Sequence, residues 1–180
     1  MAEDISQNEL ERAYLYYDSI REHDRKLYNL QNDFSAYVFE NIGAFPVNNG
    51  SFGLWLNLTT SDLDLAVGVS EPELDEVLHT LTQLGKLIAV RQSTPDSSRH
   101  VFHFEREGVT IDLGVLPPRD FEWTVQGMNN CRAGMTHLER VIHVWTKSKL
   151  LQRGLQVEYA KYKLEPYEKY FNSHFIFTPI

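Results

Sequence analysis

The chain has 180 residues, a mass of 20.9 kDa and a net charge of −8, with 42% hydrophobic and 23% charged residues. This composition is that of an ordinary folded protein and excludes collagen-like, low-complexity and disordered classes. The acidic balance, with a pI near 5.3, argues against a broad surface that holds nucleic acid by charge alone. Any basic groove must therefore be local.

Cysteine use and the N-terminus bear on the cellular compartment. The single cysteine, Cys131, cannot form an internal disulfide, so the chain does not call for an oxidising compartment. The N-terminus, MAEDISQNELER, is acidic and polar where a secretory signal has a positive start and an apolar run. No stretch approaches the ~20 apolar residues of a membrane span. We therefore expect a cytoplasmic or nuclear protein with no membrane partner.

The first 43 residues are predicted to form an N-terminal helical segment. Apolar spacing over residues 7–42 is typical of two helices or one bent helix, with Gly43 as the stop. We expect these helices to pack as a lid on a sheet.

Residues 44–116 alternate strand and helix signals. A helix is predicted over 71–84, because Ser70 and Glu73 form a capping-box pattern before an apolar stripe that ends at Gly85. Strands are predicted at LDLAVGV (63–69), KLIAVRQ (86–92), HVFHFER (100–106) and VTIDLGV (109–115), with hairpin connections at STPDSS and Glu107-Gly108. A strand, a crossover helix and an antiparallel meander predict a mixed sheet in an α/β or α+β domain.

Residues 117–180 are predicted to form a C-terminal helical segment. Thr136 and Glu139 form a second capping-box pattern, and the apolar face that follows ends at Gly154. The tail EYAKYKLEPYEKYF is predicted to continue as helix.

The candidate chemistry lies on two of the predicted strands. Period-2 alternation places Asp62 and Asp64 on one face of the first strand, and Asp112 on the matching face of the last strand. If these strands are neighbours, the three carboxylates converge beside small residues that leave room for a ligand. Such a cluster needs a cation, and hard oxygen donors without His or Cys suit Mg²⁺ or Mn²⁺. Upstream, Gly50-Ser51 offers a tight turn and a hydroxyl that suit a phosphate.

The segment GSFGLWLNLTTSDLDLAV resembles the signature of the DNA polymerase beta-like nucleotidyltransferase superfamily, in which Gly-Ser precedes Asp-x-Asp and a later strand supplies a third Asp. The similarity is greatest to the poly(A) polymerase and terminal uridylyltransferase branch. The matching residues are Gly50, Ser51, Ser61, Asp62, Leu63, Asp64, Leu65 and Asp112. VIHVWTKSKLLQRGL is similar to the helix that opens the central domain of those enzymes, with Lys147 at the position of a triphosphate-binding lysine. Trp55 stands where the family usually has glycine, and the Ser-rich stretch that usually follows the lysine helix is absent.

The resemblance implies a metal-dependent nucleotidyltransferase that moves a nucleoside monophosphate from an NTP to an acceptor hydroxyl. Asp62, Asp64 and Asp112 would be the catalytic metal ligands for two Mg²⁺ or Mn²⁺ ions. The nucleotide-binding residues would be Gly50, Ser51 and Lys147. Residues 44–116 would then be the catalytic core, and residues 117–180 part of a central domain that a partner protein could complete.

The acceptor is left open by the sequence. The family branch favours an RNA 3′ end, and a strip of basic and aromatic residues could hold RNA. The strip consists of Lys147, Lys149, Arg153, Lys161, Lys163, Tyr159, Tyr162 and Tyr167. Apart from Lys147, these residues also suit an amphipathic helix with a solvated charged face. The alternatives are a minimal transferase that modifies a small molecule or a protein, and a catalytically silent subunit with the same fold.

The sequence gives little support for a histidine metal site or for a cysteine nucleophile. His100 and His103 are predicted to lie on opposite faces of one strand, so we expect structural roles for both. His137 and His143 are not helical neighbours, and Cys131 has no evident base nearby in sequence.

Overall fold

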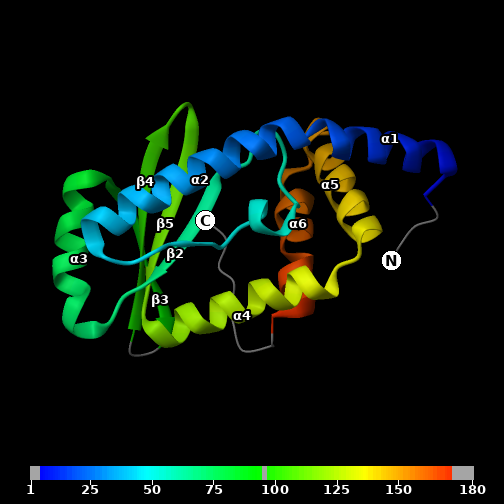
Figure 1. Cartoon of the computed structure of the whole chain (residues 1–180). Coiled ribbons are helices and arrows are strands. Elements are labelled where there is room, and N and C mark those ends of the chain that lie inside the picture. Colours follow the sequence, from blue (N-terminus) through cyan, green and yellow to red (C-terminus); the bar gives the residue numbers. More distant parts are fainter. Residues whose placement is uncertain (1–4, 95–96, 172–180) are drawn as a thin grey trace.

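The computed structural model describes residues 5–94 and 97–171, and one mixed sheet flanked by helices organises them (Figure 1). The strands are β1 (Val47–Asn48), β2 (Leu63–Gly68), β3 (Lys86–Thr94), β4 (Ser97–Arg106) and β5 (Val109–Leu116). The helices are α1 (Gln7–Ser19), α2 (Arg21–Ile42), the 3-10 turn η1 (Phe52–Leu54), α3 (Glu71–Leu84), α4 (Pro118–Gly134), α5 (His137–Gln152) and α6 (Gln156–Tyr170). The predicted α/β class is confirmed.

The sheet has the order β1-β2-β5-β4-β3. β2 and β5 pair in parallel, whereas the β1–β2, β5–β4 and β4–β3 pairs are antiparallel. The parallel pair lies inside the sheet, because α3 carries the chain from β2 to the far edge and the β3–β4–β5 meander then returns beside β2. Strands far apart in the sequence thus become direct neighbours.

One face of the sheet is buried under α2 and α3 (Figure 1). The apolar residues predicted to share a face of 63–69 and of 109–115 do so in this core, as period-2 alternation requires. The core contains, from the helices, Leu27, Leu30, Phe34, Val38, Val77 and Leu81, and from the strands Leu63, Leu65, Val67, Phe102, Phe104, Ile111, Leu113 and Val115.

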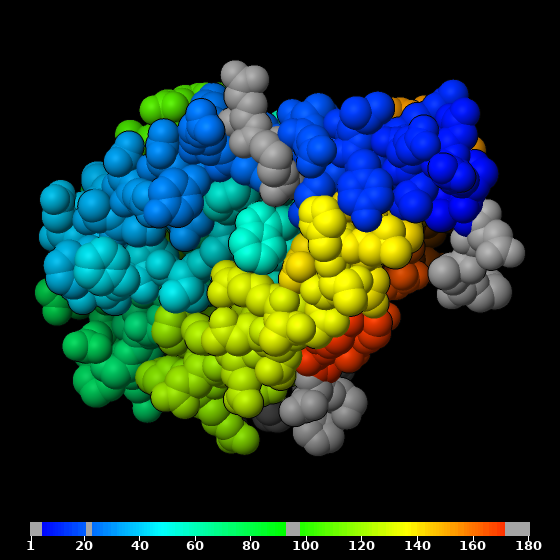
Figure 2. Space-filling view, turned by 45° about the vertical axis from the view of Figure 1, so that its right-hand side comes forward, coloured from blue at the N-terminus to red at the C-terminus, as the bar shows by residue number. Residues whose placement is uncertain are grey.

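A second core forms beside the sheet, where α1, η1, α4, α5 and α6 meet. Ala13 and Tyr17 of α1 belong to it, and Tyr16 meets Trp145 of α5 with ring centroids 5.8 Å apart. The expectation that both N-terminal helices cover the sheet is therefore right for α2 and wrong for α1. In the space-filling view, the cyan segment that follows α2 lies between the blue N-terminal helices and the yellow α5 (Figure 2).

Two predicted turns are present with the backbone conformations that they need. Gly43 ends α2 with φ 70°, and Glu107 and Gly108 both adopt positive φ (51° and 69°) between β4 and β5. Two consecutive left-handed residues make the tight hairpin turn whose twist matches that of antiparallel strands. This turn sets the register of the β4–β5 pair. The STPDSS connection includes residues 95–96, which lie outside the described residues.

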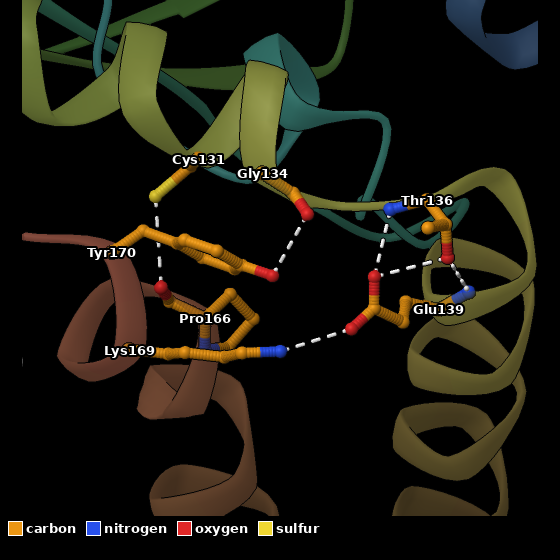
Figure 3. Close-up of polar contacts among 7 residues, drawn as sticks. All are labelled: Cys131, Gly134, Thr136, Glu139, Pro166, Lys169 and Tyr170. Carbon is orange, nitrogen blue, oxygen red and sulfur yellow. Dashed lines mark hydrogen bonds and ion pairs between the residues drawn. The ribbon is translucent and has the colours of Figure 1, made fainter.

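The second capping box is present, and its glutamate also joins two helices (Figure 3). The Glu139 carboxylate accepts hydrogen bonds from the Thr136 backbone N–H (2.7 Å) and from Lys169 Nζ of α6 (2.9 Å). These bonds, the backbone one foremost, lower the pKa of Glu139 to about 2. Tyr170 of α6 donates from its hydroxyl to the Gly134 carbonyl of α4 at 3.0 Å. The end of α6 is thereby tied to both α4 and α5.

The capping box predicted at Ser70 and Glu73 does not form. The Ser70 hydroxyl bonds the Glu73 carboxylate directly and does not cap a backbone N–H of α3. The predicted bounds of the helix are nevertheless right. Among the residues that the structure describes, no helix has the length and apolar character needed to cross a membrane.

Candidate functional site

The two strands that carry the predicted carboxylates are adjacent and in register. Asp64 of β2 lies directly opposite Asp112 of β5 in the parallel pair. Adjacent strands are about 4.8 Å apart, so these two residues lie side by side on the same face of the sheet. Asp62 comes just before β2 and is exposed, Asp64 is half-buried, and Asp112 is buried. The predicted convergence of the two strands is confirmed.

The small residues on this face do not leave an open pocket, contrary to expectation. A Cβ at Gly68 would lie 2.7 Å from a ring carbon of Phe121, and a Cβ at Gly114 would lie 2.8 Å from Arg99 Nε. The side chains of α4 and β4 therefore occupy the space that the glycines provide.

Gly50 brings its backbone against the Asp64 side chain. A Cβ added at Gly50 would lie 2.6 Å from the Asp64 Cβ and would overlap Oδ2. The Gly50 N–H donates to Asn48 Oδ1 at 3.1 Å, which holds the turn in place. The predicted phosphate-binding turn is thus in contact with a predicted metal ligand, and Ser51, which follows, is buried.

We expect Gly50→Ala to displace the Asp64 carboxylate. Overpacking at such a site typically costs about 1–3 kcal/mol of unfolding free energy. If the site performs the nucleotide transfer that the sequence resemblance implies, this activity should fall at least about 10-fold, because a small misplacement of a reacting group is costly. Gly154→Ala is the control: Gly154 has φ 71° and no atoms within 4 Å of a Cβ, so this variant should lose stability without losing transfer. Equal activity of the two variants would show that displacement of the Asp64 carboxylate does not affect catalysis.

The loop after Ser51 is tied to the helices by arginines. Arg132 of α4 donates from Nε to the Gly53 carbonyl at 2.8 Å. Trp55 adopts φ 57°, a conformation that favours glycine, and Arg140 lies over its ring at 5.2 Å from the centroid. The chain therefore keeps the backbone conformation that a glycine would take at this position, and supports a tryptophan there.

Burial and mutual repulsion make the carboxylates reluctant to ionise together. Burial raises the pKa of Asp64 to about 6, and the Asp112 and Asp62 charges add to the rise while Lys163 opposes it. Burial also raises the pKa of Asp62, with Asp112 again contributing. A cation close to these oxygens would remove the repulsion. Lys163 of α6 supplies positive charge within range of both Asp62 and Asp64.

Lys147 lies beneath the surface and not in an open groove. Its side chain is 1% exposed, and Nζ donates to the Leu56 carbonyl at 2.7 Å. The ring of Tyr159 lies 5.9 Å from Nζ. Burial and the charge of Lys163 lower the pKa of Lys147 to about 7, although the Asp64 charge partly opposes them. Lys147 thus lies within electrostatic range of Asp64, but its side chain would have to move to touch a nucleotide.

Three other members of the predicted basic and aromatic strip have partners in the helical region or are buried. Lys149 lies 4.4 Å from the Trp145 ring centroid, Tyr162 stacks on His143, and Tyr167 is buried. These three residues therefore fit the expected amphipathic helical face better than an open RNA-binding strip.

His103, expected to be structural, contacts a candidate catalytic residue. It lies opposite Asp112 in the β4–β5 pair, with its Nδ1 3.1 Å from Asp112 Oδ1 and its Nε2 3.2 Å from Glu105 Oε1. The hydrogen bond with Asp112 raises the pKa of His103. The signal was present in the sequence, because counting back from the Glu107-Gly108 turn pairs residue 103 with residue 112.

Cys131 and His143 are held as core residues. Burial raises the pKa of the Cys131 thiol to about 11, and its Sγ lies 3.6 Å from the Pro166 carbonyl (Figure 3). Burial lowers the pKa of His143 to about 3. A neutral buried thiol and a neutral buried imidazole are poor nucleophile and base candidates.

Comparison with solved structures identifies proteins that share the fold of this chain. No protein-family model and no curated protein matches the sequence. A cytoplasmic RNA terminal U-transferase superposes with a TM-score of 0.57 at 14% identity, over 82% of this chain and 47% of that one. Cid1, an RNA terminal uridylyl transferase, gives 0.55 at 14% identity, over 82% and 46%. GLD-2 in its complex with RNP-8 gives 0.51 at 11% identity, over 79% and 51%.

The fold is that of the polymerase beta-like nucleotidyltransferases. The chain spans about half the length of these structures, and at such low identity the likeness concerns the fold alone. Within this nucleotidyltransferase fold, Asp64 and Asp112 lie on the paired strands β2 and β5, and Asp62 directly precedes β2.

The carboxylates of this fold fit a divalent cation only in part. Among residues 5–94 and 97–171, no three His, Cys, Asp or Glu side chains form a metal site by themselves. Mg²⁺, however, usually keeps several waters and takes further ligands from substrate phosphates. Hard oxygen donors on two adjacent strands, where the Asp112 charge helps to raise the pKa of Asp62 and of Asp64, suit such an incomplete ligand set. The donor chemistry is thus compatible with Mg²⁺ or Mn²⁺ bound together with a nucleotide.

Proposed function

We propose that the protein is a metal-dependent nucleotidyltransferase that transfers a nucleoside monophosphate from an NTP to an acceptor hydroxyl, most favourably an RNA 3′ end. The observation that carries this proposal is the register of Asp64 with Asp112 on adjacent parallel strands, with Asp62 beside them and Gly50 against Asp64. The fold supports it, because the solved structures that share this fold include RNA terminal uridylyl transferases, and Cid1 structures hold MgGTP or MgATP.

In the proposed reaction, the acceptor oxygen forms a bond to the α-phosphorus, and the bond from that phosphorus to the bridging oxygen breaks. Pyrophosphate leaves with that oxygen, and the hydroxyl proton passes toward the Asp112 carboxylate and solvent. Asp62 and Asp64 would hold the divalent ions, which when bound polarise the phosphates and neutralise developing charge. Gly50 and Ser51 would hold the phosphates, and Lys147 would add a positive charge near them.

Two other functions have an observation in their favour. A transferase that modifies a small molecule or a protein is favoured by the net charge of −8 and by the ring contacts that engage Lys149 and Tyr162 of the basic strip. A silent subunit completed by a protein partner is favoured by the burial of Lys147. The division into a core of residues 44–116 and a partial central domain of 117–180 remains part of the proposal.

The test is incorporation of each labelled NTP, with Mg²⁺ or Mn²⁺, into an oligo-RNA, a small-molecule mixture and the protein itself. We expect label on RNA that disappears in the Asp62→Ala/Asp64→Ala double variant. The matched control, Asp33→Ala/Glu40→Ala, removes two exposed carboxylates from α2 and should keep full activity. Label only on another acceptor would support the second function. Label nowhere would contradict a transferase that is active alone.

A further inference from the structure

The contact between His103 and Asp112 is fixed by strand register. The two residues lie directly opposite each other in the antiparallel β4–β5 pair, where Cβ atoms are about 4.5–5.5 Å apart. The adjoining pairs up to the hairpin turn, Arg106 with Val109 and Glu105 with Thr110, are continuous. The imidazole is therefore held against the carboxylate by the sheet itself and not by a mobile loop.

Both ring nitrogens of His103 are occupied. Nδ1 lies 3.1 Å from Asp112 Oδ1, and because a carboxylate only accepts hydrogen bonds, Nδ1 is the donor. Nε2 lies 3.2 Å from Glu105 Oε1, and the same oxygen is 3.4 Å from Thr110 Oγ1. The ring orientation is thus set from both sides, as with groups that orient metal ligands from outside the coordination sphere.

We propose that His103 is the positioning residue of the third carboxylate. By donating to Oδ1, it fixes the rotamer of Asp112 and leaves Oδ2 for the divalent cation and the acceptor hydroxyl, while Glu105 fixes the ring. The inference rests on the proposed function, because only a transferase gives Asp112 a reacting partner. It assigns a role to a residue that neither touches the nucleotide nor lies in the Asp-x-Asp motif.

Three features favour positioning over a purely structural role. His103 is on the face that carries Asp64 and Asp112, not on the face packed against α2 and α3. Its side chain is 30% exposed, so it adds little to the core. His100, on the same strand but the other face, has a buried Nδ1 with no hydrogen-bond partner among the described residues. Of the two histidines, only His103 is bonded to a candidate catalytic group.

The test compares His103→Ala with His103→Asn in the full chain, with His100→Asn as the matched control on the same strand. Transfer kinetics are measured with the NTP that labels best, and binding of Mn²⁺ alone is measured by electron paramagnetic resonance. His103→Ala should lower kcat and weaken Mn²⁺ binding by about 10-fold each, with KM for the NTP within about twofold. His103→Asn places an amide N–H near the position of Nδ1 and should recover kcat to within about threefold. His100→Asn should change neither quantity.

Several results would overturn the positioning role. These are wild-type kcat and Mn²⁺ affinity in His103→Ala, tighter Mn²⁺ binding in that variant, or failure of His103→Asn to recover kcat. If His103→Ala does not fold, His103→Leu fills the ring volume without a donor and takes its place. Asp112→Asn separates the two proposals. A wild type that transfers nothing contradicts the proposed function, whereas loss in Asp112→Asn with full activity in His103→Ala contradicts the positioning role alone.

Discussion

Replacement of Asp64 by Asn should abolish nucleotide transfer and at the same time make the protein more stable at neutral pH. The variant keeps the shape of the side chain but removes one charge from the proposed metal site, so we expect transfer to fall on the order of a thousandfold or more. The unfolding free energy at pH 7 should rise by about 1–3 kcal/mol, because the folded protein no longer has to bury a charged carboxylate.

The pH dependence gives this prediction its sign. The pKa of Asp64 is about 6 in the folded protein and 3.8 as a free group, so between these values the folded state binds more protons than the unfolded state. The contribution of Asp64 to stability is therefore complete below pH 3.8 and is lost as pH rises through 6. Urea unfolding in EDTA from pH 4 to pH 7.5 should show the gap between Asp64→Asn and wild type widening with pH.

Asp62→Asn is the comparison variant for this experiment. Replacement of Asp62 should also abolish transfer. Because Asp62 is exposed, the gain in unfolding free energy should be smaller than for Asp64→Asn. A destabilised Asp64→Asn protein would show that the carboxylate is held by favourable bonds in the folded state. Wild-type transfer by either variant would make the metal assignment wrong.

The sheet and its register could be predicted, because local chemistry decides them. Alternation placed Asp64 and Asp112 on matching faces, and the left-handed pair Glu107-Gly108 fixed the β4–β5 hairpin. The same turn also determines the contact between His103 and Asp112. Strand alternation assigns His103 to a face, but only the register set by the turn identifies Asp112 as its partner. α4 was not separately predicted, since it contains Gly127 and lacks a strong apolar stripe. It forms because Phe121 and Met128 pack on the sheet and in the second core.

The sequence-based predictions that the structure contradicts depend on long-range packing. Gly68 and Gly114 seemed to leave space for a ligand, but side chains from other elements, Phe121 and Arg99, fill it. The capping box at Ser70 failed because a hydroxyl can choose between a backbone N–H and a nearby carboxylate. The depth of Lys147 was equally unpredictable, since α6 and the Leu56 loop close over it only in the folded chain.

Replacement of Lys147 by Met should raise the free energy of unfolding while weakening catalysis. Met is similar in length and uncharged, so the variant avoids burying an ammonium group but leaves the Leu56 carbonyl without its donor. We expect a net gain of about 1–2 kcal/mol at pH 7. If Lys147 leaves this carbonyl for the triphosphate during turnover, transfer should fall about 10- to 100-fold with a higher KM for the NTP.

The sign of the pH effect is opposite to that for Asp64. The folded pKa of Lys147 is about 7 against 10.5 for the free group, so between these values the unfolded state binds more protons. The penalty for burying Lys147 is complete below pH 7 and disappears as pH rises toward 10.5. The stability gap between Lys147→Met and wild type should therefore narrow from pH 7 to pH 9 in urea unfolding. A gap that does not change with pH would show that Lys147 is equally charged in both states.

The same variant decides whether Lys147 serves catalysis or only the fold. A Lys147→Met protein that is more stable but impaired in transfer would mean that the Lys147 amine near Asp64 destabilises the fold and contributes to catalysis. This combination is expected of a functional group. A less stable protein with normal kcat and KM would make the bond to Leu56 the whole role of Lys147. Lys147→Arg supplies the control, because a guanidinium keeps the charge but does not fit the buried space, and should lose stability in either case.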